Sequence, residues 1–322
     1  MRLLKFDRRL KMKKLLLIAL VIASLFLPGC KNEKKLKIGV CMALFDDAWL
    51  TYVREEIIKW GNAHPDVELT IVDSKNDPAI QTGQVENFLA KKVNALVVMP
   101  PDASAVEPIT RMATSAKVPL VYLNRQVENL PPGVIYVGSR SIDAGIYEMT
   151  ELGRLMGGKG NIVIMLGELA HEASRNRAAG IKQVIAEKYP DIKILAEQAG
   201  NWKRDEGKTL MENWLASGMK IDGVASCNDE MALGAILAIK AAGKLGQIKV
   251  CGVDGTDDAL SAMDRGELDC TVFQDPKGQA EEGMNAAYLM ALGKPNPKVK
   301  DSIIWVPYQP VTKENYKSFI RR

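Results

Sequence analysis

Residues 223–235 read GVASCNDEMALGA, in which an apolar run of strand length is followed at once by polar residues and the start of a helix. The apolar run is Gly223–Cys227, and the helix-like stretch is Asp229–Ala242. An apolar run without strict alternation is typical of a strand buried on both faces, as in a parallel sheet covered by helices. The stretch therefore predicts one β–α unit, with polar side chains where the strand ends.

The same order of elements repeats along the chain. Further strands are expected at Leu36–Met42, Val67–Val72, Ala95–Val98, Leu120–Leu123, Asn161–Leu166, Ile192–Ala196, Ile248–Val253 and Cys270–Phe273. Helices are expected between them, at Trp49–His64, Ile80–Lys92, Ser104–Ala116, Ile142–Met156, Arg177–Lys188 and Asp205–Ala216. This alternation predicts the doubly wound α/β class. The pattern restarts near Gly138, after a loop-like run at 129–133, which indicates two similar halves.

Polar and aromatic residues follow nearly every expected strand. They are Asp46, Asp47 and Trp49; Asn124 and Arg125; Glu168, His171, Arg175 and Arg177; Trp202; Asn228; Asp254; and Gln274. Open α/β sheets bind ligands outside the carboxyl ends of their strands, so two such edges facing each other would form a cleft. Carboxylates, amides and Arg suit pairs of hydroxyls, and aromatic faces pack against the C–H surface of a ring. These residue types favour a polyhydroxylated ligand.

The chain after its N-terminal segment resembles the periplasmic sugar-binding proteins of the galactose/ribose type. The runs that carry the resemblance occur in order: Ile38-Gly39-Val40, Asp46-Asp47-Ala48-Trp49, Leu123-Asn124-Arg125, Arg177-Ala178-Ala179-Gly180-Ile181, Asn228-Asp229-Glu230-Met231-Ala232-Leu233-Gly234-Ala235, Gly252-Val253-Asp254-Gly255 and Thr271-Val272-Phe273-Gln274. The resemblance implies a type I periplasmic-binding-protein fold, with two Rossmann-like lobes joined by three crossovers. It places residues 37–139 and 275–305 in an N-terminal lobe, and 140–274 and 306–322 in a C-terminal lobe.

The resemblance also implies a set of ligand-binding residues and a function. The set is Asp47, Trp49, Asn124, Arg125, His171, Arg177, Trp202, Asn228, Asp254 and Gln274. Asp47 would accept from ligand hydroxyls, and Trp49 and Trp202 would stack on opposite faces of a ring. The implied function is that of a monomeric solute-binding protein that closes on a sugar or polyol and delivers it to an ABC transporter permease. A sensor coupled to a chemoreceptor is an alternative that can coexist with transport.

Two departures from the galactose-type pattern affect the expected ligand. Ala173 stands where those proteins have an Asp, two residues after His171. The run Gly157-Gly158-Lys159-Gly160 stands where they have a calcium loop, and it offers no side-chain oxygen ligand, so no metal is expected. Inositol- and rhizopine-binding relatives share the framework. A myo-inositol-like cyclitol is therefore favoured, with galactose, glucose or ribose as alternatives.

The N-terminus resembles an export signal with a lipid-attachment site. A basic segment, Arg2–Lys14, precedes the uncharged run Leu15–Leu27, which is too short to cross roughly 30 Å of hydrocarbon comfortably. Leu27-Pro28-Gly29-Cys30 then resembles a bacterial lipobox. We expect a signal peptide at 1–29, a lipidated Cys30 with a polar tether at 30–36, and a membrane-anchored protein in the periplasm or at the cell surface.

Charge and motifs argue against other classes of protein. Residues 1–29 hold seven of the 43 Lys/Arg and one of the 39 Asp/Glu, so the remainder carries 36 basic and 38 acidic residues, a net charge of −2. This balance offers no basic surface for nucleic acid. The sequence contains two His residues and no nucleophile elbow, phosphate loop or zinc spacing. Neither an enzyme nor a cofactor is expected.

Three local questions stay open at this stage. Cys41, Cys227, Cys251 and Cys270 are read as small buried residues, although export would allow Cys227 to pair with Cys251. Asp229 fits a helix N-cap. Asp47 and Asp254 could likewise serve as a cap or form a turn instead of contacting a ligand.

Overall fold

The computed structural model describes residues 34–321, and Leu36–Arg322 form one compact unit. The expected signal peptide at 1–29, the lipidation at Cys30 and the first residues of the tether lie outside the described residues. Among the described helices, none combines the length and the apolar character that a membrane crossing requires.

The first lobe is built on a six-stranded parallel sheet in the order β11-β5-β4-β3-β1-β2. Its strands are β1 (Leu36–Met42), β2 (Val67–Asp73), β3 (Ala95–Val98), β4 (Leu120–Leu123), β5 (Val134–Gly138) and β11 (Ile303–Trp305). Every residue of β3, β4 and β5 is buried, as expected for strands covered on both faces.

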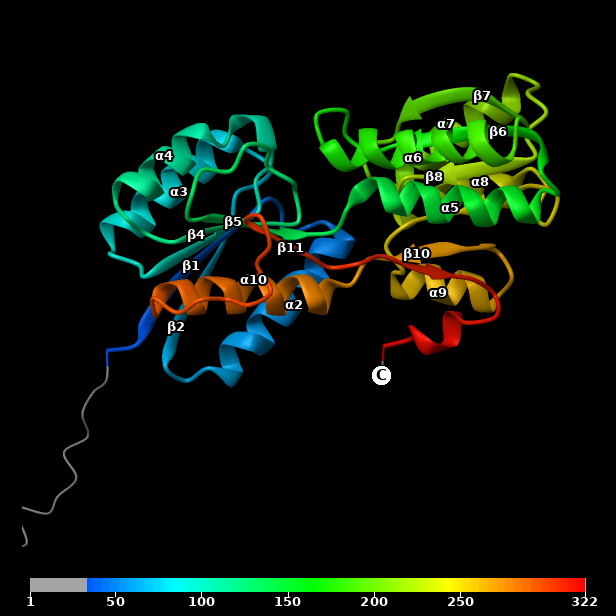
Figure 1. Ribbon diagram of the computed structural model, residues 1–322. Coiled ribbons are helices and arrows are strands. Elements are labelled where there is room, and N and C mark those ends of the chain that lie inside the picture. The colour runs from blue at the N-terminus through cyan, green and yellow to red at the C-terminus, as the bar shows by residue number, and fades with distance from the viewer. Residues whose placement is uncertain (1–33, 322) are drawn as a thin grey trace, which may run out of the picture. The chain divides into compact units, whose positions relative to one another are not determined.

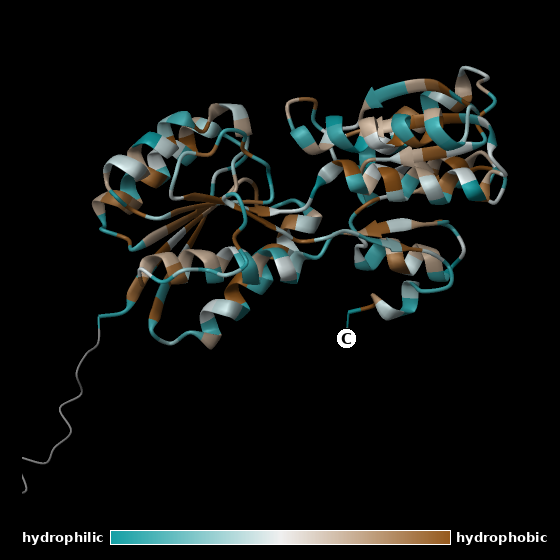
Figure 2. Cartoon of the chain, viewed as in Figure 1, coloured by the Kyte–Doolittle hydropathy of each residue, from teal (hydrophilic) through white to brown (hydrophobic). Residues whose placement is uncertain are grey.

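Helices cover both faces of this sheet (Figure 1). Helices α2 (Ala48–Ala63) and α10 (Pro276–Ala291) pack together in one apolar cluster with the sheet. Helices α3 (Pro78–Ala90) and α4 (Glu107–Ser115) pack in a second cluster, and the short η1 (Ala103–Ala105) precedes α4. The strands are strongly hydrophobic while the helices carry hydrophilic residues as well, as Figure 2 shows.

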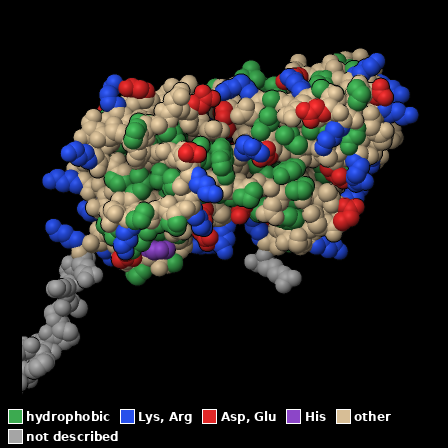
Figure 3. All heavy atoms as spheres, viewed as in Figure 1, with side chains coloured by type: hydrophobic (Ala, Val, Ile, Leu, Met, Phe, Trp, Pro, Cys, Tyr) green, Lys and Arg blue, Asp and Glu red, His purple; other side chains and the backbone are tan. Residues whose placement is uncertain are grey.

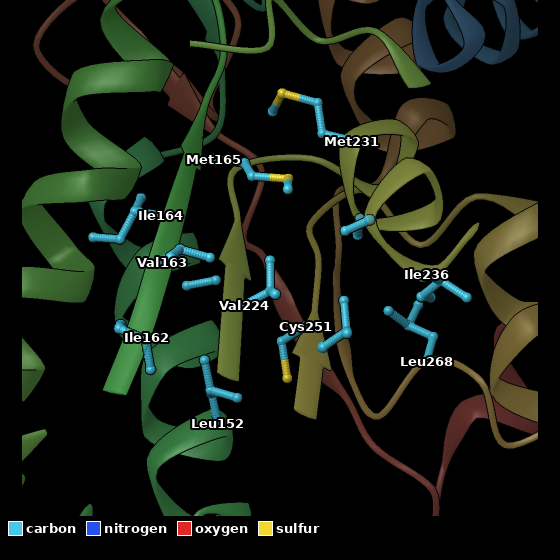
Figure 4. Packing of buried hydrophobic residues seen from close by; sticks show 14 of the residues in the cluster. Leu152, Ile162, Val163, Ile164, Met165, Val224, Met231, Ile236, Cys251 and Leu268 are labelled. Carbon is cyan, nitrogen blue, oxygen red and sulfur yellow. The ribbon is translucent and has the colours of Figure 1, made fainter. Parts of the chain in front are cut away.

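The second lobe contains a four-stranded parallel sheet in the order β7-β6-β8-β9. Its strands are β6 (Lys159–Leu166), β7 (Asp191–Ala199), β8 (Gly223–Ser226) and β9 (Lys249–Cys251), and its helices are α5 (Ser141–Leu155), α6 (Glu172–Lys188), α7 (Arg204–Ala216) and α8 (Asp229–Ala241). Leu152, Ile162, Val224 and Ile236 belong to the apolar core that these elements share, seen in Figure 4.

Two helix pairs of the second lobe meet at glycines. A Cβ atom on Gly234 of α8 would lie 2.0 Å from the carbonyl oxygen of Arg204 in α7, and one on Gly145 of α5 would lie 1.9 Å from that of Arg177 in α6. A real side chain cannot approach backbone so closely, so only glycine permits these contacts. Gly234 belongs to the run at 228–235, one of the runs that carry the family resemblance.

A two-stranded antiparallel ribbon completes the second lobe. Strand β10 (Thr271–Phe273) pairs with β12 (Gln309–Val311), and α9 (Asp257–Asp264) and η2 (Tyr316–Ser318) lie with it. The chain passes between the lobes three times: after β5, after β10 and after β11. The predicted class, two α/β lobes with parallel sheets joined by three crossovers, is confirmed.

Several local expectations need correction. Strands β5, β11 and β12 were not expected from the sequence, and α6 begins at Glu172 rather than at Arg177. The N-cap of α8 is Asn228, whose side chain accepts from the Met231 amide, and not Asp229. Cys251 forms a disulfide with Cys270 rather than with Cys227, because Cys270 lies opposite Cys251 in a β-bridge.

The molecular surface carries charges of both signs. On the face shown in Figure 3, Lys and Arg side chains are interspersed with Asp and Glu side chains over both lobes. Many charged side chains of the described residues pair with a neighbour, such as Arg154 with Glu151 and Lys182 with Glu197. Mixed charges of this kind favour solubility, and they do not form a basic strip on the face shown.

Candidate ligand-binding site

One pocket gathers the side chains that follow the strands of both parallel sheets. It encloses about 480 Å³ of space that protein atoms do not fill, part of it open to solvent. Its lining contains all ten residues predicted from the sequence: Asp47, Trp49, Asn124, Arg125, His171, Arg177, Trp202, Asn228, Asp254 and Gln274. Four lining residues were not predicted: Leu50, Ser141, Ala173 and Tyr308.

The topology explains why residues so far apart in the sequence meet here. Asp47 caps α2 five residues after β1 ends, and Asn124 and Arg125 directly follow β4. Asn228 caps α8 two residues after β8 ends, and Asp254 comes three residues after β9. In parallel sheets the carboxyl ends of all strands lie at one edge, which is where open α/β proteins bind their ligands.

Three lining residues have unusual backbone conformations. Asn124, Trp202 and Asp254 have φ angles of +68°, +67° and +130°, in the range that favours glycine. Asp254 is the most unusual, and its amide and carbonyl groups are both hydrogen-bonded to the segment at 272–274. Strained residues of this kind persist only where their surroundings hold them, and they cluster at functional sites.

Arg177 is the centre of the polar contacts on the second-lobe side. Its Nη2 donates to Gln274 Oε1 at 2.8 Å and to the Tyr308 hydroxyl at 3.0 Å, and its Nη1 donates to the Cys227 carbonyl. Asp254 Oδ1 lies 3.7 Å from the same Nη1. Burial disfavours the charge, but Tyr308 and Asp254 raise the pKa of Arg177 above its ordinary value, so the guanidinium stays cationic.

Two carboxylates of the pocket belong to different lobes. Burial raises the pKa of Asp254 well above its ordinary value, and the charge of Arg177 opposes that shift. Burial also raises the pKa of Asp47, which is opposed by the hydrogen bond from the Leu50 amide to Asp47 Oδ1 at 2.8 Å. The capping role considered for Asp47 is therefore confirmed, and one of its oxygens is engaged inside the protein.

On the first-lobe side, Asn124 and Arg125 are held by backbone and side-chain partners. Asn124 Nδ2 donates to Gln279 Oε1 at 3.1 Å, and the Tyr136 hydroxyl donates to the Asn124 carbonyl at 2.7 Å. Arg125 donates to the Pro101 carbonyl and, at 3.4 Å, to Asn76 Oδ1. Burial lowers the pKa of Arg125. Only part of each side chain's hydrogen-bonding capacity is used by these contacts.

His171 lies against an aromatic ring and a carboxylate. Its ring meets that of Trp202 edge-on, with centroids 5.4 Å apart, and its Nε2 lies 3.2 Å from Glu172 Oε2. The Ser141 hydroxyl donates to Glu172 Oε1 at 3.0 Å. Burial, helped by the charge of Arg125, lowers the pKa of His171 to about 4, so the imidazole is neutral at pH 7.

Asn228 and Asp229 organise the loops around the pocket. Asn228 Oδ1 accepts from the Met231 amide, and its Nδ2 donates to the Trp202 carbonyl at 3.0 Å. Asp229 accepts from the Thr256 amide at 2.8 Å and from the Thr271 hydroxyl at 2.6 Å. Burial raises the pKa of Asp229 to about 7. Asp229 thus fixes the turn that follows Asp254 rather than capping a helix.

Several buried polar atoms of the lining residues have no hydrogen-bond partner among the described residues. They are Arg125 Nε, Arg177 Nε, Trp202 Nε1 and His171 Nδ1. Buried polar groups are paired in most proteins, and each exception calls for an explanation. A ligand with several hydroxyl groups would supply partners for such atoms.

The chemical groups of the pocket suit binding better than catalysis. The Ser141 hydroxyl donates to Glu172 rather than to His171, so no imidazole accepts its proton as a serine nucleophile requires. Among residues 34–321, no cluster of His, Cys, Asp and Glu is arranged to hold a metal ion. What the pocket offers instead is carboxylates, amides and guanidinium groups beside the indoles of Trp49 and Trp202.

Comparison with known proteins identifies relatives over nearly the whole described chain. A family model described as a periplasmic binding protein domain matches residues 38–295. A solute-binding protein of an ABC transporter from Bacillus halodurans, solved with bound myo-inositol, is 39% identical with a TM-score of 0.85, covering 90% of this chain and 99% of that one.

Two sequence relatives carry names that assign a small-molecule ligand to them. A protein of Rhizobium meliloti whose name assigns it to rhizopine binding is 40% identical over 287 residues, covering 88% of this chain and 92% of its own. A xylitol-binding protein of Mycolicibacterium smegmatis is 36% identical over 286 residues, covering 88% of this chain and 79% of its own.

Proposed function

The chain belongs to the periplasmic binding protein family, and from that premise we propose that it captures a cyclitol, with myo-inositol as the favoured ligand, for an ABC transporter. The observation that carries the proposal is the pocket itself. Ten polar and aromatic residues from both lobes line one space, and several of their buried donors have no partner among the described residues.

The ligand class follows from the chemistry of the lining. A ring of hydroxyls can donate to Asp47 and Asp254 while it accepts from Arg125 and Arg177. The indoles of Trp49 and Trp202 can cover the apolar C–H faces of the ring. Ala173 places a methyl group, not a third carboxylate, beside His171. The relatives that bind myo-inositol and xylitol support a polyol ligand over a charged one.

We propose that binding closes the two lobes on the ligand. The proposed lobes are residues 37–139 with 275–305 and residues 140–274 with 306–322. Asp47 and Arg125 would hold the ligand from the first lobe, and Arg177, Asp254 and Gln274 from the second lobe and its crossover. Closure would replace water by fixed hydrogen bonds, and a buried carboxylate left without its partner would cost a few kcal/mol. The closed monomer would then dock on a membrane permease.

Export and lipid attachment belong to the same proposal. A basic segment followed by an apolar run and Leu27-Pro28-Gly29-Cys30 would direct the chain out of the cytoplasm and attach a lipid to Cys30. The Cys251–Cys270 disulfide supports an oxidising compartment, because such bonds are rare in the cytosol. Mass spectrometry of the membrane fraction tests the anchor, since a Cys30→Ala variant should lose both the lipid and the membrane association.

A thermal-shift screen tests the ligand class. The panel is myo-inositol, xylitol, ribose, xylose, glucose and galactose, each at millimolar concentration. Because a ligand that binds only the folded state stabilises it in proportion to the logarithm of its concentration over Kd, we expect myo-inositol to give the largest increase in Tm. Unchanged ligands after incubation would support binding without catalysis. A panel with no shift, or conversion of a panel member, would defeat the proposal.

A further inference from the structure

The disulfide between Cys251 and Cys270 joins two segments that each lead into the pocket. Cys251 ends β9, at the edge of the four-stranded sheet, and Cys270 directly precedes β10 in the separate two-stranded ribbon. Asp254 follows Cys251 by three residues, and Gln274 follows Cys270 by four. Both of these residues line the pocket.

The backbone of Asp254 depends on the segment that the disulfide ties beside it. The Asp254 amide donates to the Val272 carbonyl at 2.8 Å, and the Gln274 amide donates to the Asp254 carbonyl at 3.1 Å. Asp254 has a φ of +130°, which an L-residue adopts only when its surroundings impose it. The neighbouring β-bridges, Cys251 with Cys270 and Asp254 with Phe273, are isolated and do not extend the main sheet.

The disulfide lies inside the protein. Cys251 and Cys270 are 0% and 1% exposed, and both belong to the apolar core of the second lobe, where Figure 4 shows Cys251 among Val224, Leu268 and other buried side chains. A bond so enclosed is poorly placed to exchange with external thiols in the folded protein. The buried location of the disulfide therefore fits a structural cross-link better than a redox switch.

We propose that the Cys251–Cys270 disulfide positions Asp254 and Gln274 for ligand binding, in addition to any effect on stability. It does so by holding β10 against the segment at 252–254, so that the strained Asp254 backbone keeps both of its hydrogen bonds. Gln274 in turn orients Arg177 through the 2.8 Å contact to its Oε1. The two cysteines are positioning residues that act through these three side chains. The effect on affinity rests on the function proposed above.

The test compares the oxidised wild-type protein with the Cys251→Ala/Cys270→Ala double variant. Amide hydrogen exchange at Asp254 and Gln274 should be at least about fivefold faster in the double variant, while the amides of β6 and β8 exchange as before. Calorimetric titration with myo-inositol, well below the unfolding temperature of both proteins, should give a Kd roughly tenfold weaker, as expected when a strained contact residue relaxes. Cys41→Ala, which removes a buried free thiol in β1 of the first lobe, is the matched control and should leave both measurements unchanged.

A double-mutant cycle separates positioning from stability. If the disulfide acts through Gln274 and its neighbours, removing it in a Gln274→Ala background should cost clearly less affinity than in the wild-type background. If the disulfide only restrains the unfolded chain, its removal would lower the unfolding midpoint with no change in Kd or in local exchange. That result would overturn the proposal. The exchange measurement needs no ligand. A wild-type protein that binds no polyol would therefore defeat the proposed function, while exchange at residues 254 and 274 would still decide the role of the disulfide.

Discussion

The guanidinium of Arg177 and the carboxylate of Asp254 lie 3.7 Å apart, and both side chains are buried in the pocket. The two groups are too far apart for a hydrogen bond, and Arg177 donates its hydrogen bonds to Cys227, Gln274 and Tyr308 instead. Asp254 is thus left with capacity to accept hydrogen bonds from a ligand, beside a cation that opposes the rise in its pKa caused by burial. This arrangement underlies the first prediction.

Asp254→Ala should abolish measurable binding of myo-inositol. The variant removes both the acceptor that Asp254 offers to the ligand and the carboxyl group 3.7 Å from the buried guanidinium of Arg177, and the expected loss is at least about a hundredfold in Kd. Asp254→Gly is the matched control for the backbone, because glycine adopts a φ of +130° without strain. Both variants should lose binding, while Asp254→Gly should unfold at the higher temperature. Near-normal affinity in either would remove Asp254 from the site.

Tyr308→Phe should weaken binding of the same ligand by roughly three- to tenfold, the usual size of one lost hydrogen bond. The hydroxyl accepts from Arg177 Nη2 at 3.0 Å, so its removal frees one donor of the guanidinium without emptying the space of the ring. Calorimetry measures the change. The control is Tyr288→Phe, whose hydroxyl contacts Asp66 on the exposed side of the first lobe and should leave affinity unaltered.

His171 should make the protein less stable as the pH falls from 6.5 to 4. Burial lowers the pKa of His171 from 6.5 to about 4, so over this range the unfolded chain binds a proton that the folded protein does not. The stability of the wild-type protein should decline relative to that of His171→Gln by up to about 3 kcal/mol at pH 4. Urea unfolding of both proteins at several pH values measures the difference, and the subtraction removes the opposite contributions of the buried carboxyl groups. If the free energy of unfolding depended on pH in the same way in both proteins, His171 would not be buried as a neutral imidazole.

Two glycine substitutions should change stability in opposite directions. Gly234→Ala would place a Cβ 2.0 Å from the Arg204 carbonyl and force α7 and α8 apart, a loss of at least about 2 kcal/mol in the free energy of unfolding. Gly83→Ala in α3 meets nothing within 4 Å and should stabilise the protein by about 0.5–1 kcal/mol. Chemical denaturation of the two variants checks both signs, and a neutral Gly234→Ala would show that the helix pair can adjust.

Much of the fold could be predicted from the sequence because buried parallel strands are continuous apolar runs. The runs at Ala95–Val98 and Leu120–Leu123 coincide with β3 and β4, since a proline or asparagine lies within two residues of each end of both runs. Strand β11 was missed because it has only three residues, of which Ile304 is buried and Trp305 is exposed. In addition, it pairs with β5, which lies in a distant part of the chain. Length and local pattern do not reveal such pairings.

The candidate site could be predicted where residues directly follow a strand, and less well elsewhere. Asp47, Asn124 and Asn228 follow strands that the sequence shows clearly. Tyr308 was missed because it lies on a crossover between β11 and β12, neither of which was expected. The partner of Cys251 was also missed, because the bridge to Cys270 is set by where the two-stranded ribbon joins the sheet. The sequence did place Cys270 near the site, since Cys270 directly precedes the run Thr271–Gln274, which ends in an expected ligand-binding residue.

Titration calorimetry of myo-inositol into the wild-type protein and into Asp254→Ala, side by side, tests the central claim most directly. The account predicts saturable binding at one site in the wild-type protein and no measurable heat in the variant, with the two proteins equally folded by circular dichroism. Binding that is equal in both proteins, or absent from the wild-type protein, would contradict the claim that this pocket captures a cyclitol.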